Sequence, residues 1–232
     1  MKAVLYSRKH LGKHGICDIR RCDWNDSLTA ISRGGGAESV FVFFQMAHAA
    51  YELKELFAFL GKEKELSAVS EIYEYCRSLF MTLWDGKWFI RAYTTKGEKY
   101  GTDSDEWNKI FLNPQSWSIL GRLPDRRTAD TAADSVMKYL YTEMGLMAHY
   151  PASSGFDWDN KSYFLYTAGA RENGGIFFHS NTWAVIAFCL LKRGNDAWKI
   201  YSSSLPGQTQ RYCRYLPYRA LCLFADNARE AS

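Results

Sequence analysis

The stretch LSAVSEIYEYCRSLFMTL, residues 66–83, carries the most regular apolar pattern in the chain and decides its fold class. Its apolar side chains recur at intervals of three and four residues, which is the repeat of one face of an α-helix. We therefore predict an amphipathic helix over residues 66–83. Its apolar face is formed by Leu66, Val69, Ile72, Tyr73, Cys76, Leu79, Phe80 and Leu83.

The preceding stretch, Ser39–Leu60, has the same repeat and predicts a second, deeply buried helix. Gly61 and Lys62 form a short connection, so the two helices should pack as an antiparallel pair. Similar patterns bring the expected number of helices to about five. The others lie near Pro114 and over Thr128–Tyr141 and Asn181–Lys192, while Met1–Leu11 resembles the end of a helix and Asp196–Tyr201 can start one more.

Two segments interrupt the helical pattern. Trp88–Tyr93 and Glu98–Thr102 are rich in strand-forming residues and are separated by a turn, which predicts a β-hairpin. Gly145–Gly169 is long and irregular, and loops of that length inside a domain are usually functional. The sequence therefore predicts a mainly all-α fold, an α/α toroid or a bundle with a small β-hairpin excursion, and we find no residue-level internal repeat.

Composition sets the class of protein. A chain of 232 residues, 47% of them hydrophobic, can bury one sizeable core, as one domain or two small ones. The net charge is +4 and the basic residues form no continuous stripe, which argues against a nucleic-acid partner but allows a small anionic ligand. We attribute the 16% of aromatic residues mainly to the core, with a few tryptophans available for sugar stacking.

The six cysteines form no C-x-x-C pair and have no zinc-site spacing, so we expect no metal. Several lie in apolar runs, which favours a reducing, cytoplasmic compartment. Met1–Tyr6 is too short an apolar run for a signal peptide. No apolar stretch is long enough to cross a bilayer, so we expect no membrane partner.

The tetrapeptide Asp23-Trp24-Asn25-Asp26 combines two carboxyl groups with an indole. An aromatic ring can stack on the apolar face of a sugar, and a nearby carboxyl group can protonate a glycosidic oxygen. Loop or helix-cap roles for these residues are equally compatible with four residues alone. A second stretch, residues 171–179, is rich in groups that bind anions and hydroxyls, which favours a functional role for the tetrapeptide.

Four motifs together resemble the cellobiose and chitobiose phosphorylase family, over roughly Lys13 to Pro206. The resemblance implies that residues 1–205 are part of an (α/α)6 catalytic barrel, preceded in the family by a β-sandwich and a linker, and that residues 206–232 are a tail that does not match the family. The motifs are Cys22–Asp26, Ala37–Val40, Lys109–Trp117 and Glu172–Phe177 with His179.

The resemblance implies an inverting phosphorolysis of a β-linked disaccharide, cellobiose or a related β-1,4-glucoside first, to an α-sugar 1-phosphate and a free sugar. It implies no cofactor, inorganic phosphate as co-substrate, and a homodimer in the full-length enzyme. The implied roles are general acid for Asp26, glycosyl contact for Trp24, acceptor contacts for Tyr166, Arg171 and Glu172, and phosphate binding for His179. Gly174 and Gly175 would let the backbone approach the ligand closely.

Departures from the family define the alternatives. Arg171 stands where the family usually has Lys, and Arg is a rigid fork rather than an equivalent donor. The family's later Ser-Trp-x-Thr-Gly-Thr loop and its upstream Arg and Asp are not found, so we expect a partial site with weak or no activity. Chitobiose, cellodextrin, laminaribiose, cellobionate or β-1,2-glucan are alternative substrates. A degenerate, non-catalytic carbohydrate-binding piece is the alternative of another class.

Four residues of these motifs also allow structural roles. His179 can be an ordinary loop or helix-start histidine, and Glu172 an ordinary surface carboxylate. We expect Trp117 to belong to the core, and Glu38 to hold a loop or cap a helix rather than to do chemistry.

Overall fold

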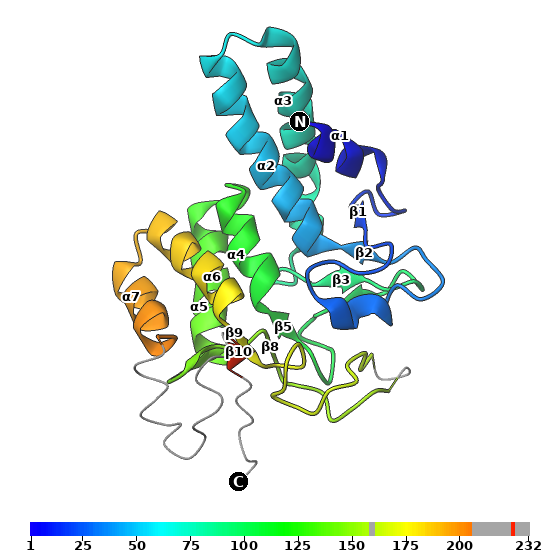
Figure 1. The fold of residues 1–232 in the computed structure, drawn as a ribbon, viewed down its shortest axis with the longest axis vertical. Helices are drawn as coiled ribbons and strands as arrows, with labels where there is room; N and C mark the ends of the chain where they lie inside the picture. Colours follow the sequence, from blue (N-terminus) through cyan, green and yellow to red (C-terminus); the bar gives the residue numbers. More distant parts are fainter. Residues whose placement is uncertain (158–160, 206–223, 226–232) are drawn as a thin grey trace.

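The computed structural model describes residues 1–157, 161–205 and 224–225. They contain seven α-helices, so the expectation of about five was too low (Figure 1). The predicted segments are confirmed within a few residues at each end. The helices are α1 (Lys2–Lys9), α2 (Val40–Phe59), α3 (Glu63–Leu79), α4 (Leu112–Leu120), α5 (Arg126–Tyr139), α6 (Phe178–Leu190) and α7 (Gly194–Ser203), with 3-10 turns η1 (Asp26–Thr29) and η2 (Phe80–Leu83).

The six helices that follow α1 form three successive hairpins in two layers. α2 packs on α3, α4 on α5 and α6 on α7, while α2, α4 and α6 lie side by side as one layer and are called the inner helices below (Figure 1). The mainly α-helical class and the helical hairpins are therefore confirmed, whereas a closed (α/α)6 ring stays a prediction. Among the described residues, no helix combines the length and apolar character that a bilayer crossing needs.

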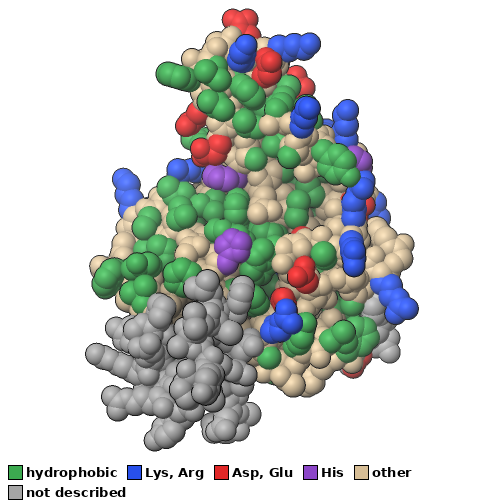
Figure 2. Space-filling view, in the orientation of Figure 1, with side chains coloured by type: hydrophobic (Ala, Val, Ile, Leu, Met, Phe, Trp, Pro, Cys, Tyr) green, Lys and Arg blue, Asp and Glu red, His purple; other side chains and the backbone are tan. Residues whose placement is uncertain are grey.

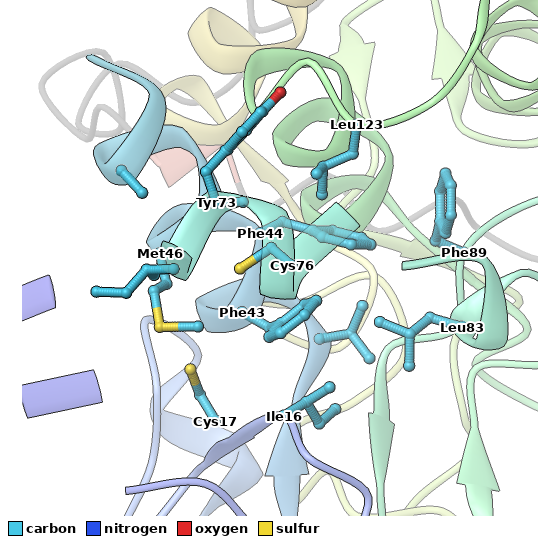
Figure 3. Close-up of a cluster of buried hydrophobic side chains, with 14 of the residues drawn as sticks. Ile16, Cys17, Phe43, Phe44, Met46, Tyr73, Cys76, Leu83, Phe89 and Leu123 are labelled. Carbon is cyan, nitrogen blue, oxygen red and sulfur yellow. The ribbon is translucent and has the colours of Figure 1, made fainter. Parts of the chain in front are cut away.

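The first hairpin forms as the sequence predicted, because the apolar faces of α2 and α3 meet over a shared cluster (Figure 3). Phe43 and Phe44 of α2 are fully buried there against Ile72 and Cys76 of α3. Ser39 directly precedes α2, and its Oγ accepts a hydrogen bond of 3.1 Å from the backbone N–H of Val42. Ser39 therefore caps this helix, and Glu38 does not.

Glu38 instead holds a loop, which was the other structural role considered for it. Its buried carboxylate accepts hydrogen bonds from the backbone N–H groups of His14 and Ile16, and lies 2.6 Å from Nδ1 of His14. The His14 ring stacks on Tyr93 at a centroid distance of 3.8 Å. This network joins the N-terminal loop to the strand that leads into α2.

The predicted β-hairpin is confirmed but belongs to a larger sheet. β3 (Ala92–Tyr93) pairs with β4 (Lys99–Tyr100), and the sheet continues through β2 (Glu38–Ser39) to β1 (Cys17–Asp18), all antiparallel. The remaining strands form three separate antiparallel pairs. They are β5 (Ile110–Phe111) with β8 (His149–Tyr150), β6 (Tyr141–Thr142) with β7 (Gly145–Leu146), and β9 (Ile176–Phe177) with β10 (Phe224–Ala225).

The structure shows an internal repeat that we did not find in the sequence. IFLNPQSW, residues 110–117, and IFFHSNTW, residues 176–183, each form a two-residue strand followed by the first turns of an inner helix. Gln115 and Asn181 occupy the same position and make the same bonds. The Gln115 amide binds the backbone N–H and C=O of Phe89 and the C=O of Phe111. The Asn181 amide likewise binds the backbone N–H and C=O of Leu146 and the C=O of Phe177.

This repeat fixes where the inner helices begin. Each amide forms hydrogen bonds to the last residue of the strand that precedes its helix, Phe111 or Phe177. Each amide also binds a residue that follows the outer helix of the preceding hairpin, Phe89 or Leu146, so neighbouring hairpins are connected. The N-terminal ends of α2, α4 and α6 consequently lie close together, beside η1 and β9 (Figure 1). The expected tail, residues 206–232, lies outside the described residues apart from β10, so its boundary at residue 205 stays a prediction.

Candidate functional site

The Asp23–Asp26 loop is a series of side-chain-capped turns. Oδ1 of Asp23 accepts from the backbone N–H of Asn25 at 2.9 Å, and Oδ1 of Asn25 accepts from that of Ser27 at 3.1 Å. The second of these bonds caps η1. Asp26 is the first residue of η1 and is exposed, so its carboxyl group is accessible to a ligand.

Arg91 anchors this loop, and we did not identify it in the sequence. Its Nη2 donates to both carboxylate oxygens of Asp23 at 2.7 Å, and both side chains are only 1% exposed. Ser39 Oγ also donates to Asp23 at 2.7 Å. Of the two carboxylates in the motif, Asp23 is thus committed to an internal ion pair and only Asp26 remains accessible.

The second motif is organised around Asn173, which is fully buried. Its Nδ2 donates to the carbonyls of Ser153 and Tyr166, and its Oδ1 accepts from the N–H of Ser153 and from Nε2 of His149. Burial lowers the pKa of His149 to about 3, so this histidine is neutral and structural. Asn173 therefore fixes the loop that carries the predicted ligand-binding residues on either side of it.

The two motifs meet, as we expected from the sequence. The indole Nε1 of Trp24 donates to Nδ1 of His179 at 3.1 Å, and Ser27 Oγ donates to Oε2 of Glu172 at 3.2 Å. These contacts come from the residues on both sides of Asp26. The loop that carries Asp26 is thereby attached to the segment of residues 171–179 on both sides of Asp26, while the role of the exposed Asp26 carboxyl group stays a prediction.

Tyr166, Arg171 and Glu172 also lie together. The guanidinium of Arg171 stands over the Tyr166 ring, 4.7 Å from its centroid, and its Nε is 3.8 Å from Oε2 of Glu172. Arg171 is exposed while Glu172 is buried at 7% exposure. Glu172 is therefore not the ordinary surface carboxylate considered as an alternative, and its contact with Ser27 connects this group to the Asp26 loop.

An aromatic wall adjoins these residues, formed by Trp24, Phe41, Trp117, Phe177 and Trp183. Trp183 touches three of the others as well as His179, with ring centroids 4.3–5.8 Å apart. Figure 2 shows hydrophobic side chains gathered on this face over α4 and α6, with histidine side chains among them. Trp117 packs partly in the core, as expected, and also belongs to the wall. Trp183 was missed, although its place four residues after His179 puts both on one helix face.

Two further features bear on the chemistry. The Sγ of Cys22 lies 3.9 Å from Oδ1 of Asp26, and burial together with the charges of Asp26 and Asp23 raises the pKa of this thiol. Cys22 is therefore a protonated thiol at neutral pH rather than a reactive thiolate.

Within the described parts of the chain, no three His, Cys, Asp or Glu side chains are grouped so that they could hold a metal ion.

The glycines after Asn173 are required by the packing of the chain itself, and their expected close approach to a ligand stays a prediction. A Cβ at Gly175 would overlap the backbone oxygen of Arg171, and one at Gly174, whose φ is +80°, would come within 2.8 Å of Ala152. The close approach that requires glycine here is thus made by the protein's own chain.

Comparisons with known proteins show which family this chain belongs to. The family model for the catalytic domain of the glycosyl hydrolase 94 superfamily matches residues 1–218, and so continues past residue 205 into the expected tail. The chain is 35% identical to N,N'-diacetylchitobiose phosphorylase of Vibrio proteolyticus, over 89% of this chain and 26% of that protein. It is 30% identical to solabiose phosphorylase of Paenibacillus borealis, over 89% of this chain and 27% of that protein. The chain spans about a quarter of the length of these curated relatives.

Proposed function

This chain belongs to the glycosyl hydrolase 94 superfamily, and we propose on that premise that the protein carrying it catalyses the phosphorolysis of a β-linked disaccharide. The single observation that carries the proposal is the meeting of the two motifs on either side of Asp26. Trp24 contacts His179, and Ser27 contacts Glu172.

In this proposal Asp26 is the general acid. It gives its proton to the glycosidic oxygen while phosphate attacks the anomeric carbon from the opposite face, and the bond to the leaving sugar breaks. The product is an α-sugar 1-phosphate with inverted configuration. An inverting hydrolase would need a second accessible carboxylate as base, whereas phosphate is already an anionic nucleophile. The engagement of Asp23 with Arg91 supports the one-acid reaction.

His179 and Arg171 are the proposed phosphate and acceptor contacts. His179 is the second residue of α6, where backbone N–H groups point outward and favour an anion. Because Trp24 donates to its Nδ1, neutral His179 carries its proton on Nε2 and can donate from there. The exposed guanidinium of Arg171 lies over Tyr166 and can bind sugar hydroxyls or a phosphate oxygen. Trp24 offers a flat ring to the glycosyl unit.

For the substrate we propose a β-1,4-linked disaccharide, with cellobiose or a related glucoside first. The similarity to a chitobiose phosphorylase puts N,N'-diacetylchitobiose next, before cellodextrin, laminaribiose, cellobionate and β-1,2-glucan. The exposed Arg171 in place of Lys is the residue that we expect to alter the choice of acceptor. The compartment proposed is the cytoplasm, and the full-length protein is proposed to be a homodimer.

The test is product analysis with the full-length protein. Each disaccharide is incubated with inorganic phosphate, and the anomeric configuration of the sugar phosphate is read by NMR. Asp26→Asn should lower kcat by about 10²–10⁴-fold with an unchanged circular dichroism spectrum, because it removes the acid and little else. Asp103→Asn is the matched control, since Asp103 is an exposed carboxylate paired with Lys87.

Two outcomes would contradict the proposal. Retained activity in Asp26→Asn would remove this residue from the acid role. Saccharide binding that is independent of phosphate, without turnover of any of these disaccharides, would instead favour a non-catalytic binding protein. The 232-residue chain by itself is expected to be weakly active or inactive, which the same assay checks.

A further inference from the structure

Arg91 is the most deeply buried cation among the described residues, with 1% exposure. A buried guanidinium is costly unless its charge and its N–H groups are matched. Here Nη2 binds both oxygens of Asp23 at 2.7 Å, and Nη1 lies 3.3 Å from Ser39 Oγ. The ring centroids of Phe41 and Phe111 each lie 5.7 Å from its Cζ, so the cation is also held between two aromatic rings.

The position of Arg91 joins three parts of the site. Its backbone N–H bonds Tyr100 O within the four-stranded sheet, and its backbone oxygen accepts from Val40 at the start of α2. Phe41 is the second residue of α2, and Phe111 directly precedes α4. The side chain therefore reaches from the sheet, between the beginnings of two inner helices, to the loop that carries Asp26.

The effect on that loop passes through Asp23. The Asp23 oxygens that accept from Arg91 also accept from the Asn25 N–H at 2.9 Å and from Ser39 Oγ at 2.7 Å. Asn25 in turn caps η1, whose first residue is Asp26. A shift of the Asp23 carboxylate is thus passed on to Asp26 through two short turns.

We propose that Arg91 is a positioning residue for the general acid. Arg91 determines the position of the Asp26 carboxyl group because it binds both carboxylate oxygens of Asp23 near the beginnings of α2 and α4. This inference rests on the proposed function for its catalytic consequence, but the positioning of the loop can be measured independently of any activity.

Arg91→Lys is the main variant, because it keeps the positive charge and loses the fork that binds both oxygens. In the full-length protein we expect kcat to fall by about 10- to 100-fold, since a displacement of about 1 Å can cost that much. KM for phosphate should change little, because the proposed phosphate contact is on α6. Hydrogen exchange of the Asn25 and Ser27 amides should speed up, while that of the α2 amides beyond the first turn, which Ser39 caps, stays the same.

Two further variants separate positioning from stability. Arg91→Met alone leaves Asp23 buried without its cation and should lower Tm, whereas Asp23→Asn/Arg91→Met removes both charges and should recover most of that Tm. kcat should stay low in the double variant. Lys161→Met is the matched control, because it takes the cation from another buried carboxylate, Asp105, outside the site, and should lower Tm while kcat is kept.

The outcomes divide clearly. Recovery of kcat together with Tm in the double variant would show a purely stabilising role and overturn the proposal, as would wild-type kcat in Arg91→Lys. Unchanged amide exchange at Asn25 and Ser27 in Arg91→Lys would also overturn it. If the wild-type protein has no phosphorylase activity, the proposed function fails, but faster exchange in Arg91→Lys would still support the positioning of the loop.

Discussion

The indole nitrogen of Trp24 donates a 3.1 Å hydrogen bond to Nδ1 of His179, although 155 positions separate the two residues. Because an indole nitrogen can only donate, Nδ1 must be the unprotonated nitrogen of a neutral imidazole. The ring proposed to face the sugar thus orients the ring proposed to face phosphate. The two halves of the candidate site are therefore physically connected.

Removing this bond should weaken phosphate binding more than it weakens the fold. In Trp24→Phe the ring is kept but the donor is lost, so the orientation of His179 is less defined. We expect KM for phosphate to rise by about two- to tenfold, the equivalent of one net hydrogen bond. Trp183→Phe is the control, because the Trp183 ring touches His179 at a centroid distance of 4.3 Å by ring packing. An equal rise in KM for phosphate in both variants would show that ring packing, and not the hydrogen bond, causes the effect.

His149 predicts a loss of stability in acid. Burial holds its pKa at about 3 in the folded state, below the ordinary value of 6.5, so between these values the unfolded chain binds a proton that the folded chain does not. Stability from this group is complete above about pH 6.5 and falls by about 1.4 kcal/mol per pH unit as pH decreases toward 3. Urea unfolding of His149→Gln and wild type across this range checks the prediction. Parallel curves for the two proteins would contradict it.

The elements that the sequence predicted well are those whose signal is local. The apolar repeats over residues 39–60 and 66–83 become α2 and α3, because each helix buries its own face against its neighbour in sequence. The meeting of the two motifs was also expected, although only through the family resemblance. Nothing in the spacing of residues 22–26 and 171–179 by itself brings them together.

The elements that were missed depend on partners distant in sequence. Arg91 lies 68 positions from Asp23 in a segment whose residues indicate a strand, so its ion pair leaves no local pattern. The hydrogen bonds of Asn173 are set by turns around Ser153 and Tyr166, which periodicity does not describe. Trp183 could have been identified from the sequence, because an alignment of residues 110–117 with residues 176–183 matches it to Trp117.

The repeat makes its own prediction about stability. Gln115→Ala and Asn181→Ala each leave one buried backbone N–H and two buried carbonyls without the amide that binds them. We expect each variant to lower the free energy of unfolding by about 2–4 kcal/mol, because unpaired buried groups cost more than the bond itself contributes. Gln45→Ala is the control, a half-buried glutamine of α2. Chemical denaturation measures all three, and a loss no larger than that of the control would refute the equivalence of the two amides.

Gly175 tests whether the loop after Arg171 must be as tight as it is. A Cβ at this position would overlap Arg171 O, the atom that accepts the Gly175 N–H at 3.0 Å, so Gly175→Ala must open the turn. Because Ala148 N–H binds Gly175 O at 2.8 Å, the segment around Ala148, between β7 and β8, would shift as well. We expect a loss of about 1–3 kcal/mol in unfolding free energy and a larger relative loss in kcat, as Arg171 and Glu172 move from the Asp26 loop. Gly194→Ala is the control, because open space surrounds that residue and alanine favours the helix α7 it begins. Wild-type kinetics in Gly175→Ala would show that the positions of Arg171 and Glu172 do not depend on this turn.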